Sequence, residues 1–290
     1  MNVREETELY CGILANYPAF QTGERAALAY DFDCPEYREL IERYGLEKLA
    51  GRGGEFTRAR RLMRYLAPRL THESNYDGHV ACNALALLDY SLDQPEHGIN
   101  CLYKSKVLAE CCLALGIPAR RVVIMPFSPY DLDNHVVTEI FDRERDKWIM
   151  LDPTTNGYFV DESGTPLSMA EIRERFAALD FVTYTTGRSR LDLVRQREKY
   201  ARQNRYLCKN AFYFILEKYN GFGAKNEWLC LIPEGFSQVR NQRLNLEYRL
   251  KNEPQEILKK TGEKWRAALK RMENAADRPI DSSAYLKKPI

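Results

Sequence analysis

The chain has 290 residues, enough for one large domain or two smaller ones with a substantial core. Hydrophobic residues make up 44% of it and charged residues 29%, which is ordinary for a soluble globular protein. The 43 Lys and Arg residues nearly balance the 41 Asp and Glu residues, so the net charge gives no reason to expect a nucleic acid or a membrane surface as a partner.

The cysteines indicate a reducing environment. Eight cysteines in a chain of this length are too few for a disulfide scaffold, and Cys111 and Cys112 lie in an apolar helical pattern typical of reduced core residues. The N-terminal residues are polar, and no apolar run approaches the ~20 residues that a membrane helix needs. We therefore expect a cytoplasmic protein without a membrane segment.

The first hundred residues are predicted to be mainly helical. Residues 1–33 are ambiguous, with a short helix expected near residues 25–30, and longer helices are expected over residues 35–50, 56–70 and 81–92. The glycine-rich segment at residues 51–54 reads as a linker, because no strand precedes it and no Gly-Lys-Ser/Thr follows, as a phosphate-binding loop would require.

The most informative stretch begins at Cys101. Apolar residues at helical spacing predict a helix from Cys101 to Gly116, where Gly and the following Pro118 end it. These apolar residues are Val107, Leu108, Cys111, Cys112 and Leu115. Cys101 then lies in the first turn, where unpaired backbone N–H groups and the helix dipole favour the thiolate and lower the pKa of the thiol.

Three strands are predicted after this helix, over residues 120–125, 135–142 and 147–152. If the turn between the last two centres on residues 144 and 145, paired residue numbers sum to 289 and Asp152 lies opposite Val137. His135 and Asp152 are then diagonal neighbours on one face, and a slip of one residue would separate them. If the helix that begins at Cys101 packs on that face, a thiol, an imidazole and a carboxylate meet.

Three linked segments resemble the transglutaminase-like superfamily of thiol acyltransferases and hydrolases. They are Asn100-Cys101 with the helix end Ala114-Leu-Gly-Ile-Pro-Ala-Arg120, then Asn134-His-Val-Val-Thr-Glu139, then Trp148-Ile-Met-Leu-Asp-Pro-Thr154. The resemblance implies an α+β fold with a papain-like core, in which the nucleophile helix packs on an antiparallel sheet. It also implies that Cys101 is the nucleophile, His135 the general base and acid, and Asp152 the orienting carboxylate.

Two departures from the animal transglutaminases argue against protein cross-linking and leave hydrolysis open. Those enzymes carry Trp after the cysteine, where this chain has Leu102. The chain is also too short for their flanking β-domains and shows no acidic calcium loop.

Three parts of the chain are expected. A helical N-terminal segment spans residues 1–50, the transglutaminase-like core spans residues 51–185, and an α/β extension spans residues 186–290. The extension is predicted to contain a helix, strands at residues 227–232 and 243–250, and a final helix over residues 254–274. The basic and aromatic stretch at residues 188–218 is interpreted as an amphipathic helix with a solvated basic side, not as a nucleic-acid site.

Other polar residues near the motif are weaker candidates. For the oxyanion donor we consider the backbone N–H of Cys101 and the side chains of Gln94 and Asn83. The other three histidines, His72, His79 and His97, are expected at the surface. No metal or cofactor is expected, because the short paired spacings of zinc ligands are absent.

These observations predict cysteine-dependent acyl transfer on an amide or peptide bond of a peptide or protein substrate, with hydrolysis favoured. A protein-glutamine transamidase and a non-catalytic transglutaminase-like binding module are the alternatives. A metal site built from Cys101, His135, Asp152 and another cysteine is the least favoured reading. The sequence does not define the oligomeric state.

Overall fold

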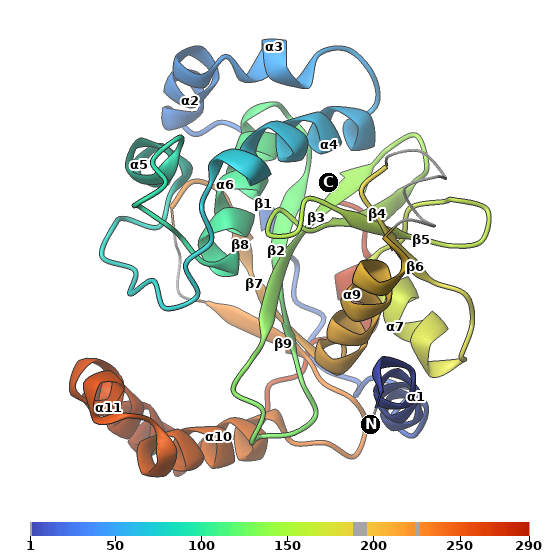
Figure 1. Ribbon diagram of the computed structural model, residues 1–290, viewed down its shortest axis with the longest axis vertical. Coiled ribbons are helices and arrows are strands. Elements are labelled where there is room, and N and C mark those ends of the chain that lie inside the picture. The colour runs from blue at the N-terminus through green and yellow to red at the C-terminus, as the bar shows by residue number, and fades with distance from the viewer. Residues whose placement is uncertain (1, 188–195, 224–226, 290) are drawn as a thin grey trace.

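The computed structural model describes residues 2–187, 196–223 and 227–289, and its centre is a five-stranded antiparallel sheet (Figure 1). The strand order is β4-β3-β2-β7-β9. The strands span β2 (Ala119–Met125), β3 (His135–Asp142), β4 (Lys147–Leu151), β7 (Tyr213–Glu217) and β9 (Trp228–Leu231). Helices lie on both faces, so the predicted α+β class with a helix on an antiparallel sheet is confirmed.

Two apolar cores separate the helices into two layers. The first core joins Ile140 and Ile149 of the sheet to the helices on one face. These are α2 (Glu36–Tyr44), α3 (Leu46–Ala50), α4 (Glu55–Leu66), α5 (Ala84–Ser91) and α6 (Cys101–Ala114), with the short 3-10 helix η1 (Ala67–Arg69) after α4. The second core joins Val137 and Met150 to helices on the opposite face. These are α1 (Val3–Ala15), α7 (Met169–Ala177), α9 (Arg197–Asn210) and the C-terminal α12 (Ser282–Leu286).

Two small strand pairs flank the main sheet. The first joins β1 (Ala29–Tyr30) in parallel to β8 (Tyr219–Asn220), and the second joins β5 (Tyr158–Val160) in antiparallel to β6 (Thr183–Thr185). β5 begins six residues after Asp152, and the backbone of Asp152 is paired with Gly157 in both directions. This tight turn fixes the main chain at Asp152, which directly follows β4 and carries the candidate carboxylate.

The β3–β4 hairpin has the predicted register. Asp142 pairs with Lys147 and Thr138 with Leu151, so each pair of residue numbers has the expected sum. The predicted start of α6 and its end at Gly116, which takes the left-handed φ of 72°, are also confirmed. The predicted helix over residues 35–50 is broken into α2 and α3 by Gly45 at a φ of 61°.

Two of the predicted secondary-structure elements are wrong. Residues 25–30 form no helix and end in β1, whereas α1 begins at Val3, directly after Asn2, whose side chain forms a capping box with Glu5. Residues 243–250 form no strand but lie in α10 (Gln238–Asn252). In a helix, residues two apart lie about 200° apart around the axis. The alternating apolar residues of this segment therefore lie on two opposite sides of α10.

The C-terminal part of the chain contributes to the central sheet. β7 pairs with β2 and with β9, and α10 then forms a helical hairpin with α11 (Gln255–Met272), at the lower edge of the molecule in Figure 1. The expected basic helix corresponds to α9 in part, while residues 188–195 lie outside the described residues. The boundaries at residues 50 and 185 stay predictions. In the described part of the chain, no helix has the length and hydropathy to cross a membrane.

Candidate active site

Cys101 is the first residue of α6 and lies on the wall of a cavity of about 900 Å³. The helix begins there because Asn100, with extended backbone, accepts the N–H of Leu102 on its side chain at 3.1 Å. Cys101 is half-buried, and His135 lines the same cavity. The structure therefore brings the candidate nucleophile and the candidate base to one opening.

His135 and Asp152 form a buried ion pair. Nε2 of His135 lies 2.9 Å from Oδ2 of Asp152, and each residue is only 3% exposed. The second carboxylate oxygen, Oδ1, accepts the N–H groups of Thr154 at 2.9 Å and Thr155 at 3.3 Å. The predicted diagonal contact is confirmed, and it leaves Nδ1 of His135 as the nitrogen that can exchange a proton with a thiol.

The condition set above for the three groups to meet, that α6 packs on the sheet face carrying His135, is not fulfilled. α6 packs on the opposite face, where Ser105 donates to the carbonyl of Val136 at 2.9 Å and receives a hydrogen bond from the Thr138 hydroxyl at 3.1 Å. Cys101 and His135 still interact, because His135 is the first residue of β3 and Cys101 the first residue of α6. The two side chains meet where the sheet ends.

The electrostatics of the pair favour a charged imidazole. Burial disfavours the charged form of His135, but the neighbouring Asp152 carboxylate and, to a smaller extent, Cys101 outweigh it and raise the pKa of His135 to about 10. Burial likewise disfavours ionised Asp152, yet His135 and hydrogen bonds from the Thr154–Thr155 turn hold the pKa of Asp152 below its usual value. Both shifts favour an ion pair of the His135 imidazolium and the Asp152 carboxylate.

Residues 45–153 match the family described as the transglutaminase-like superfamily. The chain contains a transglutaminase-like domain. This domain includes α6, β2, β3 and β4, and therefore Cys101, His135 and Asp152. The family resemblance predicted from the sequence motifs is confirmed.

One solved structure similar to this chain is a proposed cysteine protease from Cytophaga hutchinsonii, with 14% sequence identity and a TM-score of 0.34. The similarity covers 57% of this chain and 59% of that protein, which is less than two thirds of its length. No curated protein matches this chain.

The two expected side-chain oxyanion donors lie away from the cavity of the transglutaminase-like domain. Asn83 caps α5, where its side-chain oxygen accepts the N–H of Ala86 at 2.9 Å. Gln94 is exposed in the turn after α5, and neither residue lines the cavity. Among the described residues, the N–H of Cys101 has no hydrogen-bond partner, so it stays the candidate donor.

The cavity also contains residues that sequence reasoning did not assign to it. Tyr206 of α9 packs its ring edge-to-face on His135, with centroids 5.4 Å apart, and Gln203 and Arg249 line the wall as well. All three lie beyond residue 153, outside the matched domain. The interleaved basic and aromatic residues of α9 were a signal for Gln203 and Tyr206, whereas Arg249 lies in α10 and had none. The cavity wall is therefore completed by the C-terminal part of the chain.

The remaining histidines differ in their relation to the site. His72 is exposed, as expected, yet it lines the rim of the cavity and hydrogen-bonds Ser74 at 3.1 Å. Partial burial and the positive charges of Lys104 and His135 lower the pKa of His72. His79 pairs with Asp77 and His97 stacks on Tyr90, both away from the cavity. In the part of the chain that the structure describes, no group of three or more His, Cys, Asp or Glu side chains is arranged to hold a metal ion.

Proposed function

We propose that this protein is a cysteine hydrolase that cleaves an amide or peptide bond through Cys101, His135 and Asp152. The observation that carries the proposal is the buried contact of 2.9 Å between His135 Nε2 and Asp152 Oδ2, beside a cysteine that opens a helix. A carboxylate on one ring nitrogen orients the imidazole and leaves the other nitrogen for the thiol. This is the arrangement that nucleophilic thiol catalysis requires.

The proposed reaction has two halves. The Cys101 thiolate attacks the substrate carbonyl, and the oxyanion that forms accepts the backbone N–H of Cys101. His135 then gives its proton to the leaving nitrogen as the C–N bond breaks, which leaves an acyl-thioester on Cys101 and a neutral imidazole. A water molecule gives a proton to His135 and its oxygen attacks the thioester. The carboxylic acid leaves, and the thiolate–imidazolium pair is restored.

A peptide or protein is the proposed substrate. The cavity at Cys101 holds about 900 Å³, and one of its lining residues, Val123, also lines a second cavity of about 720 Å³ between the sheet and α10. Each volume also falls in the range of small-molecule sites, so the argument for an extended chain rests on the two hollows sharing Val123. The presence of Leu102 in place of the Trp of animal transglutaminases supports water over an amine as acyl acceptor.

The experiment compares the wild type with Cys101→Ser on a mixture of unfolded proteins, in the presence of an isotopically labelled primary amine. Mass spectrometry counts new peptide termini, which report hydrolysis, and labelled glutamine side chains, which report transamidation. We expect new termini only with the wild type. Amine incorporation without new termini would show transamidation in place of hydrolysis. The absence of both products would overturn the proposed enzymatic function.

A further inference from the structure

The loop at residues 126–134 connects β2 to β3 and ends directly before His135. Its residues 131–134 line the candidate active-site cavity. Backbone carbonyls in such a loop have no partner in the sheet and need one from elsewhere. The conformation of this loop determines where His135 enters β3.

Helix α10 supplies partners to this loop. Asn241 donates to the carbonyl of Phe127 at 2.8 Å, and Asn245 donates to the carbonyl of Pro129 at 2.7 Å. Arg249 donates to the carbonyl of Leu132 at 2.5 Å. These three donors are spaced four residues apart and therefore share one face of the helix. Together they form a row of polar side chains that follows the loop toward His135, which we call the α10 ladder.

The ladder is itself braced. Nε of Arg249 donates to Oδ1 of Asn245 at 3.0 Å, and Nη1 pairs with Glu253 at 3.1 Å. The guanidinium also lies over the ring of Trp265 in α11, 5.6 Å from its centroid. The side chain of Arg249 is therefore held by three neighbours besides the loop, as expected of a group that fixes a geometry.

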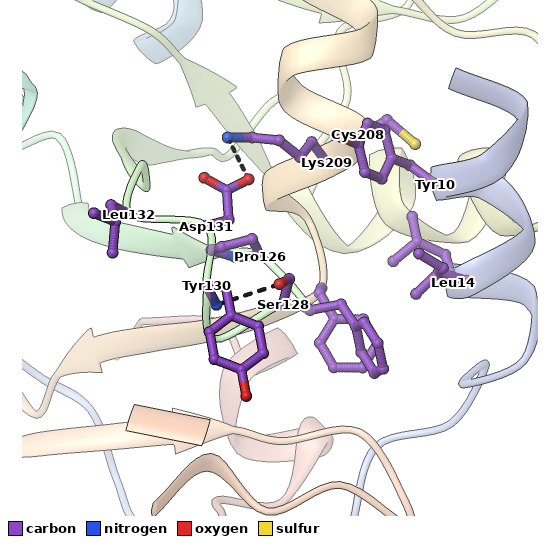
Figure 2. Close-up of a pocket in the computed structure, with 12 residues that line it drawn as sticks. Tyr10, Leu14, Pro126, Ser128, Tyr130, Asp131, Leu132, Cys208 and Lys209 are labelled. Atoms are coloured by element: carbon purple, nitrogen blue, oxygen red, sulfur yellow. Dashed lines mark hydrogen bonds and ion pairs between the residues drawn. The ribbon is translucent and has the colours of Figure 1, made fainter. Parts of the chain in front are cut away.

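Helix α9 holds the same loop through a second set of contacts. Nζ of Lys209 pairs with Asp131 at 2.9 Å, as Figure 2 shows, and with Asp133 at 3.3 Å. The hydroxyl of Tyr206 donates to Asp133 at 3.2 Å. The loop is thus held by two helices that both lie beyond the matched transglutaminase-like domain.

We propose that Asn241, Asn245 and Arg249 are positioning residues for the reaction of Cys101, acting through the 126–134 loop on His135. This inference rests on the proposed function and extends it to a part of the chain outside the matched domain. Without the ladder, the loop loses three anchors just before His135. Displacing a catalytic group by about 1 Å can cost on the order of 100-fold in rate, so a small shift of His135 is sufficient.

The test compares Asn245→Ala with Asn252→Ala. Asn252 lies on the same helix, is exposed, and donates only to the carbonyl of Tyr248 in its own helix at 2.8 Å. Both substitutions introduce Ala, which favours the helix. The readout is the rate of Cys101 alkylation by iodoacetamide at acidic pH, read by peptide mass spectrometry, with circular dichroism as the check on folding.

We expect alkylation at about pH 5.5 to fall about tenfold in Asn245→Ala and to stay at the wild-type rate in Asn252→Ala, because only the first disturbs the pairing of His135 with the thiol. Equal rates in a folded Asn245→Ala protein would overturn the positioning role. If that variant does not fold, Asn241→Ala, which removes the single bond to Phe127, is judged by the same criterion. A wild type that is not labelled at acidic pH would instead contradict the proposed function.

Discussion

The two ends of α6 carry cysteines with opposite surroundings. Cys101, at the N-terminal end, is half-buried on a large cavity beside His135. Cys111 and Cys112, about three turns later, are fully buried among apolar side chains in the first core. Burial raises the pKa of Cys112 to about 12 and that of Cys111 well above its usual value. One helix thus holds one thiol on the wall of a cavity and two inside an apolar core.

This contrast teaches that position along the helix decides what a cysteine does. At the N-terminal end the backbone N–H groups are unpaired and a sheet edge supplies an imidazole, whereas the C-terminal turns that hold Cys111 and Cys112 offer neither. The buried C-terminal turns of α6 also help to hold Cys101 in position, because they anchor the helix on the face of the sheet that carries Ile140 and Ile149. The two kinds of cysteine should therefore fail in different ways when they are changed.

The largest effect is expected from replacing a cysteine of α6 by serine, once at Cys101 and once at Cys112. Cys101→Ser should lower the hydrolysis rate on the order of 10³-fold or more, because a hydroxyl has no comparable ionised form at neutral pH, with little change in stability. Cys112→Ser should retain the chemistry but lower the free energy of unfolding by about 1–3 kcal/mol, since it buries a hydroxyl among apolar groups. Hydrolysis assays and urea unfolding of both variants measure the two effects. Hydrolytic activity retained in Cys101→Ser would contradict the proposed difference between Cys101 and the buried cysteines.

The next effect concerns Asp152, which orients His135. Asp152→Asn should lower the hydrolysis rate by on the order of 10²–10⁴-fold, because general-base catalysis by a correctly held imidazole contributes that much. The matched control is Asp77→Asn, which removes the partner of the exposed His79 away from the cavity and should leave the rate unchanged. Comparable losses in both variants would show that the effect is not specific to the buried pair.

The same pair predicts a pH dependence of stability. His135 has a raised pKa, so its contribution is fully present below about pH 6.5, the usual value, and is lost as the pH rises through about 10. Asp152 has a lowered pKa, so its contribution is present above about pH 3.8 and is lost as the pH falls further. The difference in unfolding free energy between wild type and Asp152→Asn should therefore be largest between about pH 4 and 6.5. Urea unfolding at pH 5.5, 7.5 and 9.5 measures it, and a difference that grows with pH would contradict the assignment.

The smallest effect is expected at Tyr206. Its ring packs on His135, and an aromatic pair of this kind contributes about 0.5–1.5 kcal/mol, equivalent to about 2–10-fold in rate. Tyr206→Ala should lose that factor in kcat/KM, whereas Tyr206→Phe keeps the ring and should lose less. If the two variants behave alike, the hydroxyl contact with Asp133 matters more than the ring.

The hairpin and α6 were predictable because each is specified locally. The capping Asn100, the glycine at residue 116 and the turn between β3 and β4 fix their own segments, and the register alone places Asp152 beside His135. The face on which α6 packs was not predictable, because that is a tertiary choice. The helix α10 was missed for a similar reason, since its apolar residues alternate as in a strand and only the fold places it against α11.

The residues that complete the cavity could not be found from the sequence either. Tyr206 and Arg249 carry no motif, and only the fold brings α9 and α10 to the loop before His135. Asn83 and Gln94 show the converse: both are near Cys101 in sequence and suitable in chemistry, but one caps a helix and the other is exposed in a turn. Proximity in the chain does not predict which polar group faces a site.

The central claim is that Cys101 is a thiolate paired with His135, and alkylation across pH tests it most directly. The rate of iodoacetamide labelling of each cysteine is measured by peptide mass spectrometry in the wild type and in His135→Ala, with the partly exposed Cys34 and Cys82 as internal references, since burial raises the pKa of both. We expect Cys101 of the wild type to be labelled first and already at about pH 5–6, and His135→Ala to lose this acidic labelling. Labelling of Cys101 that rises only near the free-thiol pKa of about 8.5, equally in both proteins, would contradict the claim.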